Sequence, residues 1–133
     1  MSTSSRRQAR ERALSLLYEC EAKDEPAKRV VDELPAAPDR FAVEVVCGVD
    51  EHRDEIDALI SKYSQAWSLE RMPAVDRNVL RMGVFELLYR PDVPTGAAIS
   101  EAVELASRYS TEESGRFVNG LLGRVAAEVR PAG

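Results

Sequence analysis

Apolar side chains in this sequence return every three or four residues, and this spacing restricts the fold more than any other feature. From Arg6 to Lys23 it places small and aliphatic residues on one helical face, and similar stripes recur as far as Val129. No stretch shows the alternation of apolar and polar residues that is typical of a half-buried strand. The sequence therefore predicts an all-helical chain, folded as a compact bundle.

Prolines and capping residues divide these stripes into six or seven predicted helices. Pro26 fits the first turn of a short second helix, because the amide hydrogen that proline lacks would have no partner there. Asp39 can cap a third helix, whose apolar stripe runs unbroken to about Tyr63. Pro73 starts a helix that is apolar nearly all round, as expected for the most enclosed member of a bundle. Two more helices follow the proline turn at positions 91–94, the last one after the cap candidates at positions 110–111.

Three of the glycines inside the predicted helices call for an explanation. Gly48 interrupts the stripe of the third helix, and Gly120 and Gly123 lie within the last. A glycine in a helix interior costs about 1 kcal/mol relative to alanine, so each needs a structural reason. We expect Gly48 to allow a bend or a close contact, and Gly120 and Gly123 to clear a strip of surface for close helix packing.

The length and composition indicate one domain. The chain has 133 residues, of which 44% are hydrophobic and 31% charged, and this suits a single globular domain. We predict one domain over residues 1–133, frayed at 1–5 and 130–133. No segment approaches the roughly 20 apolar residues of a membrane span, and the N-terminus lacks the apolar stretch of a signal peptide. A cytoplasmic protein that does not enter membranes is expected.

The charge is unevenly distributed along the chain. The formal net charge is -5, yet residues 1–13 hold four arginines and one glutamate, so that a basic arm (Arg6, Arg7, Arg10 and Arg12) precedes an acidic body. On a helix, Arg6, Arg7 and Arg10 could line one ridge and grip phosphates. The alternative is a helix start that serves only solubility. An anionic partner for the arm and a basic partner for the body would explain the asymmetry.

Groups suited to catalysis or metal binding are scarce in the sequence. His52 is the only histidine, and its register with an apolar stripe favours a core position over a functional one. Cys20 and Cys47 do not form a CxxC pair and are interpreted as buried thiols in a reducing compartment. Neither GxxxxGK[ST] nor GxGxxG occurs. We therefore predict no enzyme activity, no cofactor and no metal site.

Three stretches of the sequence resemble the NusB family of transcription antitermination factors: RRQARERALSLLYE, WSLERMPAVDRNVLRMGVFELLY and ISEAVELASRYSTEESGRFVNGLLGRV. Their order and spacing carry the resemblance, which is weakest between Pro26 and Gly48. It implies an all-helical fold of two packed helical subdomains. It also implies RNA binding: recognition of single-stranded boxA RNA in ribosomal RNA leader transcripts, together with NusE, a basic ribosomal protein of the small subunit, in the transcription elongation complex.

The resemblance also assigns residues to two surfaces. Arg6, Arg7 and Arg10 match the RNA-contacting arm of the family, with Gln8 between them. Phe117 and Asn119 match positions that could stack on a base or hydrogen-bond to RNA. A core position is an equally good interpretation of Phe117. The predicted RNA surface comprises Arg6, Arg7, Gln8, Arg10, Glu113, Arg116, Phe117 and Asn119. Tyr18, Glu70 and Asp76 match positions that meet NusE, although Tyr18 could also be mainly a packing residue.

Two other functions are compatible with the same fold. The chain could be a homodimeric scaffold that binds protein alone, and the sequence leaves self-association open. A similar helical module also delivers RNA to the catalytic domain of some ribosomal RNA cytosine methyltransferases, but no such domain is expected here. Loss of RNA binding on removal of residues 1–12 would argue against the scaffold.

Overall fold

The computed structural model describes the backbone of residues 2–131 and the side chains of residues 6–131. This part of the chain forms seven α-helices and one short 3-10 helix, and no strand occurs in it, which confirms the predicted all-helical fold. In chain order the helices are α1 (Ser2–Lys23), α2 (Ala27–Asp32), α3 (Arg40–Glu51), α4 (Arg53–Tyr63), the 3-10 helix η1 (Leu69–Arg71), α5 (Ala74–Tyr89), α6 (Thr95–Tyr109) and α7 (Glu112–Val129).

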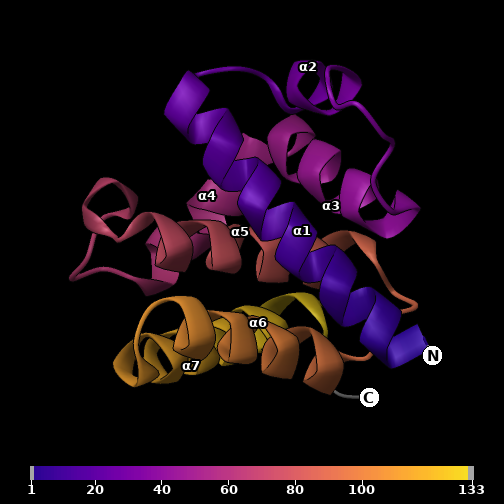
Figure 1. The fold of residues 1–133 in the computed structure, drawn as a ribbon. Helices are drawn as coiled ribbons and strands as arrows, with labels where there is room; N and C mark the ends of the chain where they lie inside the picture. The colour runs from indigo at the N-terminus through magenta and orange to yellow at the C-terminus, as the bar shows by residue number, and fades with distance from the viewer. Residues whose placement is uncertain (1, 132–133) are drawn as a thin grey trace.

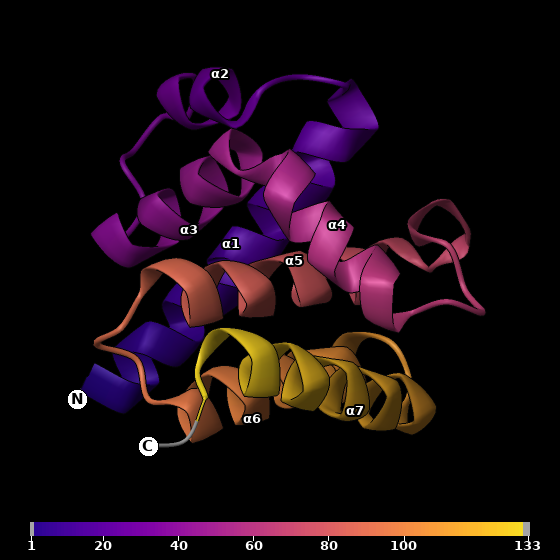
Figure 2. The same ribbon diagram turned by 180° about the vertical axis from the view of Figure 1, so that it is seen from behind.

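The helices form two groups that share α5 (Figure 1). Helices α1 to α4 lie on one side of α5, and α6 and α7 lie side by side on the other, as the reverse view also shows (Figure 2). Helix α5 packs against α1, α3, α4, α6 and α7, and its side chains are buried almost without interruption from Asp76 to Leu87. The two predicted helical subdomains are confirmed, and the central position of α5 explains its all-round apolar sequence.

The segment predicted as one long third helix is two helices. The chain bends at His52, whose backbone angles are φ -110° and ψ 26°, so α3 ends before it and α4 begins after it. The His52 amide still donates to the carbonyl of Gly48, and the His52 carbonyl still accepts from the amide of Ile56. Backbone hydrogen bonds thus continue across the bend. The apolar residues keep their helical spacing through it, so the sequence pattern does not reveal the bend. The predicted core position of His52 is also wrong, because its side chain is 32% exposed and stacks on Tyr89 with ring centroids 4.1 Å apart.

The glycines divide into two kinds. A Cβ atom on Gly48 would lie 2.1 Å from Cε1 of Phe85, so the predicted close contact is confirmed. In contrast, a Cβ atom on Gly120 or Gly123 would have no neighbour within 4 Å. Both glycines are exposed. The prediction that they clear a strip for helix packing is therefore wrong, because that strip of α7 faces open space.

Two predicted helix caps are confirmed. The Asp39 carboxylate accepts a 2.8 Å hydrogen bond from the amide of Phe41 at the start of α3. The Thr111 hydroxyl accepts a 2.9 Å hydrogen bond from the amide of Ser114 at the start of α7. Each cap satisfies an amide that has no partner within its helix. Pro26 directly precedes α2, one position earlier than predicted.

The end of α7 is attached to the end of α5 by a single side chain. The Arg130 guanidinium donates hydrogen bonds of 2.6 to 3.1 Å to the carbonyl oxygens of Glu86, Leu87, Arg90 and Val93. The last carbonyls of a helix have no partner within it, and Arg130 supplies one. The sequence predicts fraying at 1–5 and 130–133, and among these residues Arg130 makes the hydrogen bonds described above. Residues 1 and 132–133, which share that prediction, lie outside the described residues.

Both cysteines are free thiols. Cys20 is buried as predicted, whereas Cys47 is only half-buried. Burial raises the pKa of each thiol above its ordinary value. Both thiols are therefore held in the protonated, weakly reactive form.

Candidate RNA interface

The first turns of α1 lie against α5 and α6, and this contact decides how the arginines of the basic arm are used. Arg7 is exposed, and its guanidinium donates to both oxygens of Glu101 on α6, at 3.1 and 2.8 Å. These hydrogen bonds lower the pKa of the Glu101 carboxyl below its ordinary value. A phosphate that binds to Arg7 through this planar pair of donors would have to displace Glu101.

Arg10, in contrast, lies inside the molecule. Its guanidinium donates to both oxygens of Glu86 on α5, at 2.9 and 2.7 Å, and the side chains are only 7% and 2% exposed. A buried, doubly hydrogen-bonded pair of this kind fixes α1 against α5, because separating it would leave two charges without partners. Arg10 is therefore not free to meet a ligand at the surface.

Arg6 lies at the edge of the same contact. Its guanidinium is 4.1 Å from the ring centroid of Phe41, and that of Arg90 is 4.8 Å from the same centroid. Arg6 also approaches Asp92 at 3.6 Å. Hydrogen bonds from Arg90 lower the pKa of Asp92 to about 2. Gln8 and Arg12 are also exposed, so Arg6, Arg7, Gln8 and Arg12 form the accessible part of the arm.

The second set of predicted RNA residues lies on the first half of α7. Glu113, Arg116 and Asn119 are exposed there. Arg116 forms no ion pair with any side chain that the structure describes. Phe117 is half-buried, with its ring edge against Trp67 at a centroid distance of 5.1 Å. Phe117 is therefore neither a core residue nor a free one, and part of its ring remains available for stacking.

The two sets of predicted RNA residues are not in contact. The arm meets the first half of α6, whereas α7 begins beyond the other end of α6 (Figure 1). Glu11 and Arg108, joined by a salt bridge, lie along the way between them. An RNA strand that touched both sets would have to follow the surface along α6.

The residues matched to a protein partner are partly accessible. Tyr18 is 56% exposed on α1, and Glu70 is exposed on η1. Asp76, however, is completely buried at the start of α5, where the Ser114 hydroxyl donates to it at 2.7 Å. A docked protein could not touch Asp76 in this conformation, although the position of Asp76 supports the junction of α5 and α7.

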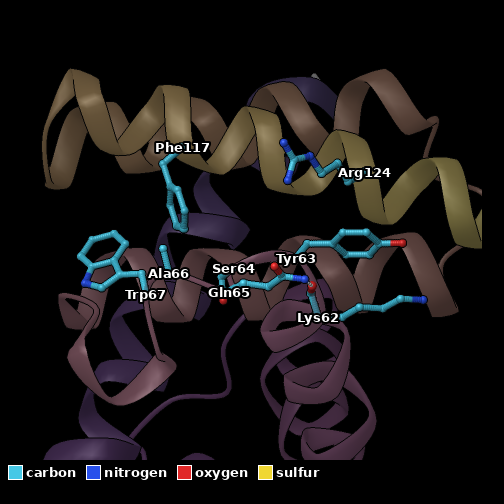
Figure 3. A pocket seen from close by; sticks show the side chains of 8 residues that line it. All are labelled: Lys62, Tyr63, Ser64, Gln65, Ala66, Trp67, Phe117 and Arg124. Carbon is cyan, nitrogen blue, oxygen red and sulfur yellow. Dashed lines mark hydrogen bonds between the residues drawn. The ribbon is translucent and has the colours of Figure 1, made fainter.

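One hollow of this surface involves residues that the sequence analysis did not single out. A groove of about 420 Å³ lies between α7 and the end of α4 with the segment that follows it (Figure 3). Helix α7 contributes Phe117 and Arg124 from one side, and Lys62, Tyr63 and Trp67 lie on the other. Trp67 is the only tryptophan in the chain. The α7 residues that face it are about fifty residues away in the sequence, so no local pattern could have revealed the groove.

Two kinds of site are absent from the part of the chain that the structure describes. No three histidine, cysteine or acidic side chains are grouped so that they could hold a metal ion. None of the described helices has the length and apolar character required to cross a membrane.

Known proteins match this chain along almost its whole length. The family model described as "NusB family" matches residues 7–127. The chain belongs to the NusB family. The transcription antitermination protein NusB of Clavibacter sepedonicus is 52% identical to it, over 93% of this chain and 97% of that protein.

Solved NusB structures have the same fold. A structure of T. maritima NusB matches with a TM-score of 0.82 and 43% identity, covering 92% of this chain and 91% of that one. A crystal structure described as antitermination factors NusB and NusE in complex with dsRNA matches with a TM-score of 0.79 and 31% identity, covering 94% of this chain and 98% of that one. The NusB fold is thus retained at moderate sequence identity.

Proposed function

We propose that this NusB-family protein is an RNA-binding transcription antitermination factor that recognises boxA-type leader RNA together with NusE. The observation that carries the proposal is the exposed group on α7, where Arg116 has no ion-pair partner among the described side chains and lies beside a half-exposed Phe117. Unpaired guanidinium groups and accessible aromatic rings are the groups with which proteins bind single-stranded RNA.

The two accessible sets of side chains have different roles in this proposal. Arg6, Arg7 and Gln8 would contact the RNA backbone from α1, and the α7 group would contact its bases. Arg10 supports the arm from within through its pair with Glu86. Glu113, at the start of α7, would accept hydrogen bonds from a base rather than bind phosphate, since its charge repels phosphate.

NusE would dock on the exposed side chains Tyr18 and Glu70, where a basic ribosomal protein would meet acidic surface. Asp76 would act from beneath this face, because it is buried. In our proposal the protein works in the cytoplasm by binding alone, as part of the elongation complex, and catalyses no reaction.

The test is a titration of labelled boxA-type RNA with the protein, in which fluorescence anisotropy measures binding. A scrambled RNA is the control. Each RNA is titrated with and without NusE across a salt series. We expect selective binding of the boxA-type RNA, tightened by NusE because the partner adds contacts. If about three arginines contact phosphates, the slope of log affinity against log salt should be roughly -2 on a single strand.

A pair of matched variants makes this test specific. Arg116→Ala removes an unpaired arginine from α7, and Arg29→Ala removes an arginine of the same charge from α2, where it is paired only with Glu25. Arg116→Ala should weaken RNA binding, while Arg29→Ala should not. Equal binding of boxA-type and scrambled RNA in both conditions would overturn the proposal and favour a protein-binding scaffold.

A further inference from the structure

We infer that the RNA path continues beyond Phe117 along α7 and that the groove between Arg124, Lys62 and Trp67 accepts a nucleotide of the single strand. This inference rests on the proposed function and extends it to residues that no family assignment above includes. Its base would lie against the Trp67 and Phe117 rings, and its phosphate would meet Arg124.

The groove has the size and chemistry for such an occupant. Its volume of about 420 Å³ falls in the range of small-molecule sites. Trp67 and Phe117 meet edge to face, with ring centroids 5.1 Å apart, so one face of an incoming base can contact either ring. Stacking of a base on an aromatic side chain contributes binding energy without depending on sequence.

The charges around the groove favour an anionic ligand. Lys62 and the Tyr63 hydroxyl both donate to Oε1 of Glu128, at 2.9 and 2.6 Å, so Glu128 compensates the charge of Lys62. Arg124 forms no ion pair with any described side chain, and its side chain lies along α7 at the rim of the groove, pointing toward Phe117 (Figure 3). The local charge is positive on a protein whose net charge is -5, so the groove would repel a basic protein and attract phosphate.

The exposed face of α7 connects this groove with the predicted RNA surface. Arg116 and Arg124 lie two helical turns apart on one side of the helix, about 12 Å along its axis. Gly120 and Gly123 lie between them, with open space where their Cβ atoms would be. A phosphate backbone can therefore approach the helix closely between two unpaired arginines.

Trp67 allows a direct test, because it is the only tryptophan in the chain and lines the groove. The full-length protein is titrated with a boxA-type RNA extended by several nucleotides, and both RNA anisotropy and Trp67 fluorescence are recorded. We expect Trp67 emission to be quenched in step with the rise in anisotropy. The same RNA annealed into a duplex should leave Trp67 unchanged, because its bases are already stacked and paired.

The variants Arg124→Ala and Arg29→Ala change the charge equally, and neither should shift the unfolding midpoint by more than an ordinary surface substitution does. We expect Arg124→Ala alone to weaken binding, by about fivefold for one lost charge-assisted hydrogen bond. Its salt slope should also become shallower by about 0.7.

The two proposals fail in distinguishable ways. If the anisotropy does not rise, the proposed function is wrong. If the anisotropy rises while Trp67 emission stays constant, or if Arg124→Ala binds like Arg29→Ala, RNA binds elsewhere and the groove inference alone is overturned. A Trp67 response to NusE but not to RNA would also overturn it and assign the groove to a protein partner.

Discussion

Helices α1 and α7 both present arginines near the candidate RNA interface, but the surroundings of these arginines differ. On α1, carboxylates of α5, α6 and the turn between them pair with Arg6, Arg7 and Arg10. On α7, Arg116 and Arg124 have no ion-pair partner among the described side chains. The number of arginines in a segment therefore does not give the charge available to a ligand. Arg6, Arg7 and Arg10 hold the fold together or must exchange partners, whereas Arg116 and Arg124 are free, as is Arg12, which is exposed on α1 and forms no ion pair with any described side chain.

Among the arginines of α1 and α7, replacing Arg10 should have the largest effect on the free energy of unfolding. Arg10→Ala should lower the free energy of unfolding by about 3–5 kcal/mol, because it leaves Glu86 charged, buried and unpaired. Arg116→Ala on α7 should change it by no more than about 0.5 kcal/mol. Urea unfolding followed by circular dichroism measures both. Equal, small losses in the two variants would contradict the structural role of Arg10.

The next largest effect on stability is expected at Gly123, on the exposed face of α7. Gly123→Ala should raise the free energy of unfolding by about 1 kcal/mol, since alanine favours a helix and its methyl group meets nothing. Gly48→Ala is the opposite control, because its methyl group would collide with Phe85 and should destabilise the protein. Thermal unfolding shows whether each substitution stabilises or destabilises the protein. A destabilising Gly123→Ala would mean that this face is covered in solution.

A smaller effect is expected where an arm arginine must exchange partners. Glu101→Gln removes the carboxylate that holds Arg7 and should tighten RNA binding by about twofold, as expected for a weak exposed ion pair. Glu104→Gln is the matched control, since Glu104 is exposed nearby and forms no hydrogen bond or ion pair with Arg7 among the described contacts. Equal tightening by both variants would indicate only a change in net charge.

The smallest expected effect is a change in the pKa of Asp92. NMR of the Asp92 carboxyl should give a pKa of about 2, and Arg90→Ala should return it toward 3.8. Because the pKa is lowered in the folded protein, the stabilisation from this contact is complete above about pH 3.8 and is lost as the pH falls through about 2. An unchanged pKa in Arg90→Ala would show that Arg90 does not hold Asp92 in solution.

Much of the fold follows from the sequence, because caps and apolar periodicity are local. Asp39 begins α3 as predicted, and α5 is as enclosed as its sequence indicates. The bend at His52 escapes prediction because backbone hydrogen bonds continue through it. The spacing of Gly120 and Gly123 shows that a strip of helix lacks side chains, but not whether that strip faces a neighbour or solvent.

The candidate site is less predictable, for a physical reason that Arg10 illustrates. Arg10 lies three residues before Ala13 and seven before Leu17, both buried, so its helical register already indicated the inner face. Its charge favoured the surface instead. Only the position of Glu86, 76 residues later in the chain, decides between the two. Pairing across such distances depends on the tertiary fold and leaves no local signal.

The pairing of Arg7 with Glu101 joins residues 94 positions apart, and this separation matters while the chain is being made. At about 5–20 residues per second, the ribosome adds Glu101 on the order of 5–20 s after Arg7. Throughout that interval the arm has no carboxylate from α6 to neutralise it. The Arg7 guanidinium of the unfinished chain thus lacks its α6 partner until Glu101 has been added.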